Sequence, residues 1–427
     1  METSLVIDPA VRELATRAKE AALNLATLPS EQKNTFLLNL AAALESDAVA
    51  ADVFRANEAD LAAGAAGGLS TAMLDRLRLD KGRLSAMAQG VREVAALPDP
   101  VGALLEERPH AKGFTIRKRR VPIGVVGVVY ESRPNVTVDC AVLCLKSGNA
   151  TILRGGKEAL HTNRALAAAI TEALIASGLP RDAIQLVPTT DREALRALLQ
   201  MDDCIHCFIP RGGEGLIRFV AENARMPVIK HYKGVCNLFL DETAKAGMAA
   251  AIAVNAKCQR PSVCNAIENL IVHAAAAPHL LPKVAAALAA EGVELRADIP
   301  AREILAAAGI AAQPASESDF HEEYLEKILA IKTVESLEEA IRFINAYGSA
   351  HSDAIVTEDA AHAQAFLNGV DSAAVYWNVS TRFTDGYEFG LGAEIGISTD
   401  KLHARGPMGL TELTSYKYEI TGHGEIR

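Results

Sequence analysis

Residues 122–137 read PIGVVGVVYESRPNVT, and within them the chain passes from one kind of secondary structure to another. The run Ile123 to Val129 holds only aliphatic residues and glycine, which is typical of a strand buried on both faces of a sheet. From about Val136 to Leu145 the apolar residues recur with helical spacing. A buried strand followed closely by a helix is the repeating unit of an α/β fold. This stretch therefore predicts a parallel sheet covered by helices.

The alternation of strand and helix continues toward the C-terminus. A helix is predicted from about residue 158 to 176, and a second α/β section from residue 236 to about 413. Strands are expected at residues 150–153, 183–187, 205–209, 236–240, 269–272, 328–331, 354–356 and 374–377. Toward the N-terminus, residues 8–97 show only helical spacing, with Asp8 and Ser30 as expected N-caps.

Two segments fit neither sheet. Residues 104–120 hold a turn flanked by alternating residues, which predicts a hairpin, and residues 413–420 alternate like an extended strand. Uncovered strands tend to pair with other chains. We therefore expect a homo-oligomer, a dimer or a tetramer, in which another subunit covers this β element. The alternative is a terminal strand that folds back on its own domain.

Composition narrows the class of protein. Half of the 427 residues are hydrophobic but only 5% are aromatic, so the core is expected to be mostly aliphatic. A formal charge of −10 argues against a nucleic-acid-binding surface. No apolar run approaches the roughly 18–20 residues of a membrane span, and the N-terminus does not look like a secretory signal. Seven cysteines in such a chain indicate reduced thiols and a cytoplasmic location.

The pair Cys204 and Cys207 has the spacing of a redox or zinc motif. The pair lies in an apparent strand, where residues three apart face opposite ways, and no second Cys/His pair follows at metal spacing. We interpret both as core residues and predict no metal site.

Cys264 is a candidate covalent nucleophile. It follows a Gln-Arg-Pro-Ser loop at the end of a helical pattern and precedes the apolar run 270–272. A thiol on such a loop can reach a cleft while the loop amides hold an oxyanion. Lys257 and Arg260 would lower its pKa if they point inward. The alternative is a buried structural cysteine.

Two glycine-rich turns are candidate phosphate sites. Residues 209–215 follow a strand and open a helix, and their glycines allow a pyrophosphate to approach the helix N-terminus. Residues 153–157 combine two glycines with Arg154 and Lys157, again after a strand. A tight turn without a ligand is the alternative for the first of these.

The chain resembles the aldehyde dehydrogenase superfamily, and within it the γ-glutamyl phosphate reductases of proline biosynthesis. The resemblance rests on residues 122–137, 209–215, 255–265, 380–385, 389–398 and 402–409. The resemblance spans nearly the whole chain. It implies an aldehyde-dehydrogenase-like α/β fold. A Rossmann-type parallel sheet would form the NADP-binding domain (residues 1–103 and 122–233), followed by an α/β catalytic domain (234–412). A small β element for oligomerisation would comprise residues 104–121 and 413–427.

The resemblance also implies roles for individual residues. It places the nucleophile at Cys264 rather than Cys258. The superfamily's oxyanion asparagine falls on Ser132, with Asn135 as a possible substitute. The implied cofactor-binding residues are Arg154, Gly155, Lys157, Pro210, Arg211, Gly212, Gly213 and Glu323. The implied substrate-binding residues are Arg133, Ser380, Thr381 and Arg382.

One departure from the hydrolytic aldehyde dehydrogenases concerns residues 230–236. Those enzymes carry a general-base glutamate there, whereas this chain offers Lys230, His231 and Lys233. Without a carboxylate base, water attacks a thioacyl intermediate slowly, and phosphate can exchange with the thiol instead. The alternative explanation for the missing glutamate is that the alignment with those enzymes is shifted within this loop.

The implied reaction is NADPH-dependent reduction of L-glutamyl 5-phosphate to L-glutamate 5-semialdehyde and phosphate through a cysteine thioacyl intermediate. NADPH is expected because Lys157 falls where NAD-linked relatives place an acidic residue. Glutamate 5-kinase is a possible partner besides the small-molecule substrate. The alternatives are an NAD-dependent aldehyde dehydrogenase oxidising a small amino-acid semialdehyde, and a non-catalytic scaffold.

Overall fold

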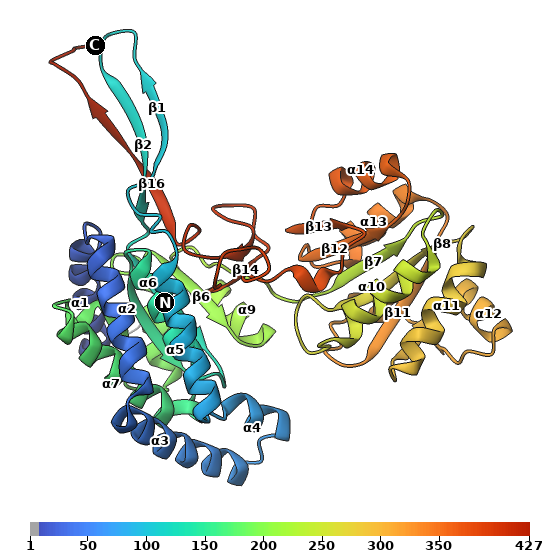
Figure 1. The fold of residues 1–427 in the computed structure, drawn as a ribbon, viewed down its shortest axis with the longest axis horizontal. Coiled ribbons are helices and arrows are strands. Elements are labelled where there is room, and N and C mark those ends of the chain that lie inside the picture. The colour runs from blue at the N-terminus through green and yellow to red at the C-terminus, as the bar shows by residue number, and fades with distance from the viewer. Residues whose placement is uncertain (1–7) are drawn as a thin grey trace, which may run out of the picture. The chain divides into compact units, whose positions relative to one another are not determined.

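The computed structural model describes residues 8–427, and the chain divides into two compact units (Figure 1). The first unit contains the chain up to Lys230, together with Gly390–Gly396 and Met408–Arg427. The second contains His231–Phe389 and Ile397–Pro407. The chain thus leaves the first unit three residues before the predicted boundary and returns to it twice. None of the helices in residues 8–427 has both the length and the apolar composition of a membrane span.

Helices alone form the first part of unit one, as predicted. They are α1 (Pro9–Leu25), α2 (Ser30–Glu45), α3 (Asp47–Ala66), α4 (Thr71–Leu77) and α5 (Lys81–Ala96). Asp8 caps α1, since its carboxylate accepts from the amide of Ala10 at 2.9 Å. Ser30 is not the expected cap of α2. Pro29 holds that position, and the Ser30 hydroxyl donates to Asp99 instead.

Four parallel strands form the sheet of unit one, in the order β5-β4-β3-β6. They are β3 (Val125–Tyr130), β4 (Ala150–Gly155), β5 (Ile184–Leu186) and β6 (Cys207–Arg211). The helices that connect or follow them are α6 (Asn135–Lys146), α7 (Leu160–Ala176), α8 (Arg192–Leu199) and α9 (Glu214–Asn223). The strand β6 starts at Cys207, so Cys204 lies in a turn before it, although both side chains are buried.

The predicted hairpin and terminal strand form one antiparallel sheet in unit one. The strand β2 (Thr115–Pro122) is central, with β1 (Leu104–Pro109) on one side and β16 (Thr414–Thr421) on the other. Figure 1 shows the three strands running together away from the helices of this unit. The terminal strand therefore pairs within its own chain, but Tyr416, Tyr418 and Ile420 remain exposed on it.

Removing residues 415–427 is expected to expose the edge of β2 and to shift an oligomer toward monomer or aggregate. The truncation keeps Leu413, whose carbonyl accepts from Asn149 at 2.8 Å, and Thr414, which accepts from Arg120 at 2.9 Å. Size-exclusion chromatography with light scattering measures the change. An unaltered molar mass would rule out β16 as an assembly element.

Seven parallel strands form the sheet of unit two, in the order β10-β9-β11-β8-β7-β12-β13. They are β7 (Cys236–Leu240), β8 (Ile267–His273), β9 (Glu294–Ala297), β10 (Gln313–Pro314), β11 (Ile328–Val334), β12 (Ser352–Val356) and β13 (Ala374–Trp377). The sequence did not predict β9 or β10, two short strands at one edge.

Helices cover both faces of this second sheet. One apolar cluster joins it to α10 (Ala246–Cys258), α11 (Ala277–Ala290) and α12 (Ile299–Ala307). A second cluster on the other face joins it to α13 (Leu337–Tyr347) and α14 (Ala360–Gly369). Two short strands outside the larger sheets, β14 (Gly396–Ser398) and β15 (Gly406–Met408), pair with each other. The central strands β7, β8 and β12 are held between two cores, so the loops at their ends start from fixed positions.

Candidate active site

The Cys264 thiol lies on the loop that joins α10 to β8, as the sequence predicted, and its side chain is half-buried. The neighbouring chain at Gly234 packs so closely that a Cβ there would collide with the backbone of Cys264. The Cys236 thiol also donates to the carbonyl oxygen of Cys264 at 3.1 Å. Both contacts involve the backbone of Cys264, so they hold the loop in place without using its sulfur atom.

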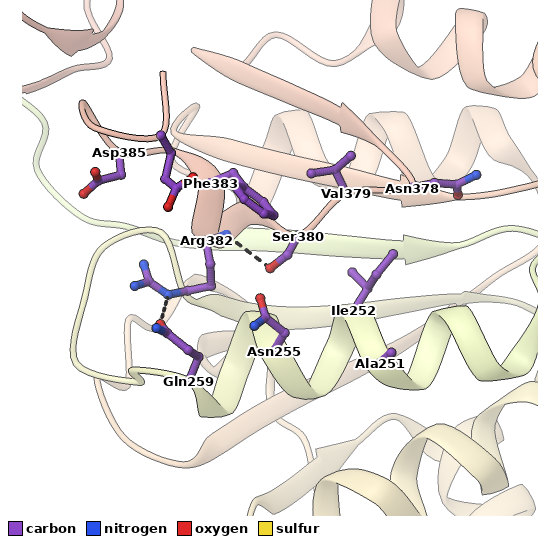
Figure 2. Close-up of a pocket in the computed structure, with 11 residues that line it drawn as sticks. Ala251, Ile252, Asn255, Gln259, Asn378, Val379, Ser380, Arg382, Phe383 and Asp385 are labelled. Atoms are coloured by element: carbon purple, nitrogen blue, oxygen red, sulfur yellow. Dashed lines mark hydrogen bonds between the residues drawn. The ribbon is translucent and has the colours of Figure 1, made fainter. Parts of the chain in front are cut away.

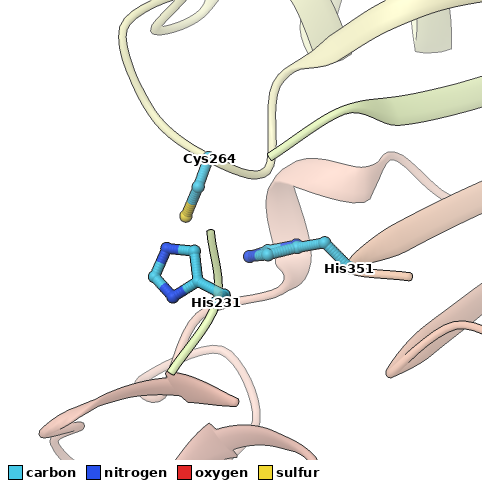
Figure 3. Close-up of side chains that lie close together, drawn as sticks. All are labelled: His231, Cys264 and His351. Carbon is cyan, nitrogen blue, oxygen red and sulfur yellow. The ribbon is translucent and has the colours of Figure 1, made fainter. Parts of the chain in front are cut away.

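Two histidines approach this thiol. One potential ligand atom each from His231, Cys264 and His351 lie within 4.8 Å of one another, and Figure 3 shows the three side chains converging. The Nδ1 atom of His231 lies 3.0 Å from the carbonyl oxygen of Ile397. A carbonyl only accepts, so Nδ1 carries a proton, and when the ring is neutral its lone pair lies on Nε2. His231 therefore offers a base beside the nucleophile.

The second histidine, His351, is fully buried just before β12. Its Nδ1 lies 2.8 Å from the hydroxyl of Ser352, and its Nε2 has no hydrogen-bond partner among residues 8–427. Burial, and then the neighbouring His231, lowers the pKa of His351 to about 3. The ring is therefore neutral at physiological pH. Sequence reasoning missed His351, because only the sheet order brings the start of β12 beside β7.

The expected effect of Lys257 on the thiol is corrected by the structure. Lys257 is fully buried and pairs with the carboxylate of Glu268 on β8. Burial raises the pKa of Glu268 to about 8, although the Lys257 ammonium opposes the shift. The Lys257 side chain thus points toward a buried partner rather than toward Cys264. Cys258, at the end of α10, has a pKa raised by burial, which does not favour a thiolate there.

A pocket of about 690 Å³ opens between α10 and the segment that follows β13. Figure 2 shows Asn255 and Gln259 rising from α10 toward Ser380 and Arg382. The Arg382 guanidinium donates to Gln259 Oε1 at 2.8 Å and also to the side-chain oxygen of Asn265. Because Asn265 directly follows Cys264, Arg382 links the pocket to the nucleophile loop.

The other predicted substrate residues differ in position: one lines the pocket, one holds the nucleophile loop, and one lies in the first unit. Ser380 lines the pocket, and its hydroxyl accepts from the amide of Arg382 at 3.3 Å. Thr381 is fully buried and donates to the carbonyl oxygen of Asn265 at 2.7 Å. The Thr381 side chain therefore positions the nucleophile loop. Arg133 lies in the first unit, exposed in the loop between β3 and α6.

Both oxyanion candidates lie in the first unit and already donate to carboxylates. The Ser132 hydroxyl donates to Glu158 at 2.8 Å, and its amide donates to the same oxygen at 2.9 Å. The Asn135 side-chain amide donates to Asp139 at 2.8 Å. The Ser132 hydroxyl has a single proton and would have to give up its bond before it could donate to a substrate oxyanion, whereas the Asn135 amide has a second N–H.

The predicted cofactor residues of unit one gather at the carboxyl ends of β4 and β6, the usual ligand edge of an open parallel sheet. Arg154 is half-buried and donates to the carbonyl oxygen of Thr190, and its Nε has no partner among residues 8–427. Gly155 ends β4, and a Cβ there would collide with Asn163. Lys157 is exposed at the start of a short 3₁₀ helix, Lys157–Ala159.

The second glycine turn joins β6 to α9. Pro210 and Arg211 end the strand, Gly212 follows, and Gly213 is the N-cap of the helix. The amide of Gly213 donates to Glu131 at 2.9 Å, so a carboxylate already lies at this helix N-terminus. The remaining cofactor candidate, Glu323, is half-buried in unit two before β11.

Comparison with known proteins identifies the family. The model of the aldehyde dehydrogenase family matches residues 7–301 and 302–417. The chain belongs to this family. It is 56% identical to gamma-glutamyl phosphate reductase of Opitutus terrae over 415 residues, which cover 97% of each chain. It is 50% identical to the Geotalea daltonii protein of the same name over 417 residues, 98% of each chain.

Solved structures of related proteins support the same family assignment. The crystal structure of gamma-glutamyl phosphate reductase from Thermotoga maritima superposes with a TM-score of 0.95 at 41% identity, covering 98% of this chain and 99% of that one. An acetylating aldehyde dehydrogenase from Geobacillus thermoglucosidasius has the same fold, with a TM-score of 0.70 at 17% identity over 98% and 97% of the two chains. The predicted family and fold class are therefore confirmed.

Proposed function

We propose that this protein reduces L-glutamyl 5-phosphate to L-glutamate 5-semialdehyde with NADPH and releases phosphate. Relatives named gamma-glutamyl phosphate reductase, 50% or more identical over nearly the whole chain, support this reaction. The observation that carries it is the Cys264 thiol beside the imidazole of His231 in a chain of this family. A thiol with an adjacent base is the arrangement that covalent acyl transfer requires.

The chain's own residues perform the acyl transfer in this mechanism. Nε2 of His231 takes the thiol proton, and the Cys264 sulfur then attacks the acyl carbon. As the sulfur–carbon bond forms, the carbon–oxygen bond to phosphate breaks, and the departing phosphate takes a proton from solvent. NADPH, when bound, would supply the hydride that reduces the thioester to the aldehyde, and the carbon–sulfur bond to Cys264 then breaks. The released thiolate finally takes its proton back from His231.

The pocket that Arg382 links to the nucleophile loop suits an amino-acid substrate. It carries the cation Arg382 together with the carboxylates Asp385 and Glu388. A glutamyl group has both an α-carboxylate and an α-ammonium, and a cation near two carboxylates can bind both ends. Arg382 would hold the carboxylate, because a guanidinium matches it in bidentate geometry. Asp385 and Glu388 would hold the ammonium.

NADPH fits the ligand edge of the first sheet. Arg154 and Lys157 place two cations beside Gly155, and the Nε atom of Arg154 is buried without a partner among residues 8–427. In this proposal Lys157 lies near the 2′-phosphate of the adenosine ribose. The pyrophosphate would approach α9 past Gly212 and Gly213 and replace the Glu131 carboxylate that accepts from the Gly213 amide.

Replacing Lys157 by glutamate is expected to raise the KM for NADPH about tenfold or more, because one charge-assisted hydrogen bond to the 2′-phosphate is lost. The KM for NADH should stay the same or fall. Steady-state kinetics with both cofactors measure the change, and Lys283→Glu, at an exposed position of α11, is the matched control. Equal efficiency of the unmodified protein with NADPH and NADH would contradict this role of Lys157.

The reverse reaction tests the proposed function. L-Glutamate 5-semialdehyde should reduce NADP⁺ only when inorganic phosphate is present, since phosphate has to release the acyl group from Cys264. An NAD-dependent aldehyde dehydrogenase would instead form free glutamate without phosphate. Phosphate-independent reduction of NAD⁺ would therefore replace the proposal by that alternative, and a non-catalytic scaffold would give neither reaction.

A further inference from the structure

The cluster around Cys264 has the donor atoms of a metal site. One thiol sulfur and two imidazole nitrogens, from His231, Cys264 and His351, lie within 4.8 Å of one another (Figure 3). Zinc sites in proteins use these donors, with Zn–N near 2.0–2.1 Å and Zn–S about 2.3 Å. Tetrahedral ligands at these lengths lie about 3.3–3.7 Å apart, so closing the site needs a movement of about 1 Å. The half-buried Cys264 side chain on its loop can make this movement.

The hydrogen bonds around the two imidazoles favour metal binding at Nε2. Nδ1 of His231 donates to the carbonyl of Ile397 at 3.0 Å, which leaves a lone pair on Nε2. Nδ1 of His351 lies 2.8 Å from the hydroxyl of Ser352. Metal-binding histidines typically make such a bond through the nitrogen that does not bind the metal. Both rings are therefore oriented as ligands before any metal arrives.

His351 supplies a second, independent observation. Its side chain is fully buried, and its Nε2 has no hydrogen-bond partner within residues 8–427. A buried polar atom without a partner is costly, and an ion that binds there removes the cost. The ring is held by a chain of hydroxyls, since Ser352 lies 2.6 Å from Thr384, which lies 2.7 Å from Tyr376. The buried nitrogen thus has a fixed direction into the cluster.

We propose that the Cys264 thiolate and the Nε2 atoms of His231 and His351 form a three-ligand site for Zn²⁺, and that its occupancy reversibly blocks the nucleophile. A sulfur–zinc bond forms, the thiol proton passes to solvent, and no group is oxidised or reduced. Water completes the coordination as a fourth ligand. The zinc-bound sulfur is then unable to attack an acyl carbon. Metal binding at these side chains does not depend on which substrate the protein takes.

Cobalt binding to tag-free protein tests the site without any substrate. Co²⁺ is expected to bind at one equivalent and to show a near-ultraviolet thiolate-to-cobalt charge-transfer band, which added Zn²⁺ removes. Cys264→Ser should lose the band. His231→Gln and His351→Gln should each weaken Co²⁺ binding by about tenfold to a hundredfold, as disturbed metal sites do. His279→Gln, at an exposed position of α11, is the matched control and should bind like the unmodified protein.

Chemical protection gives a second measurement. Zn²⁺ should protect Cys264, but not Cys258, from iodoacetamide, and EDTA should restore labelling at Cys264. If His351→Gln does not fold, His231→Gln and the protection experiment still test the proposal. A charge-transfer band that persists in Cys264→Ser, unchanged Co²⁺ affinity in His231→Gln, or no protection of Cys264 would each overturn the site. None of these readouts requires turnover, so they are independent of the proposed reaction.

Discussion

Cys264→Ala is expected to abolish turnover, by ~10⁴-fold or more, because the acyl group loses the only nucleophile that the mechanism provides. The fold and NADPH binding should persist. The contacts that hold this loop, the close packing of Gly234 and the bond from the Cys236 thiol, both involve the backbone of residue 264, which alanine retains. Initial rates together with NADPH binding by fluorescence titration separate the loss of chemistry from a loss of folding.

Cys258→Ala is the matched control, and it should be nearly silent. Cys258 ends α10 rather than lying on the loop, and burial raises the pKa of its thiol, so it reacts slowly. Peptide mapping after partial inactivation with iodoacetamide should find the label on Cys264. Inactivation that follows labelling of Cys258 would instead move the nucleophile to that residue.

Much of the fold was predictable because its strands are buried on both faces. The apolar runs of β3, β4, β7, β8 and β12 stand out in the sequence, and each forms a strand in the structure. Four short strands were missed: β10 at the edge of the second sheet, β9 next to it, and the separate pair β14 and β15. Their residues alternate too briefly to show the period of a strand.

The site was less predictable, because its geometry depends on pairs far apart in the chain. The local sequence placed Cys264 on its loop, but the position of His351 depends on the pairing of β12 with β7. The sequence left open whether Lys257 points toward the thiol, and the structure pairs it with Glu268 of the next strand instead. The hydrogen bonds of Ser132 and Asn135 to Glu158 and Asp139 likewise needed coordinates. Sequence alone shows which residues are reactive, whereas pairing across the sheet decides what they face.

Arg382→Gln is expected to raise the KM for the glutamyl substrate by about tenfold to a hundredfold, with a smaller effect on the KM for NADPH. The size follows from losing one or two charge-assisted hydrogen bonds to the α-carboxylate. Burial, and then the nearby Arg260, lowers the pKa of Arg382, and a guanidinium held this way is only partly solvated, so a substrate anion should bind it strongly.

Two further variants distinguish substrate binding from support of the loop. Arg382 also contacts Gln259 and Asn265, so a purely structural role would lower kcat through a displaced Cys264 and leave the KM nearly unchanged. Arg382→Lys keeps the charge but loses the planar fork, and we expect it to recover only part of the affinity. Arg302→Gln, at an exposed position of α12, should leave both constants unaltered. A fall in kcat at constant KM in Arg382→Gln would show that this guanidinium positions Cys264 and does not bind the carboxylate, because only a ground-state contact with substrate would change the KM.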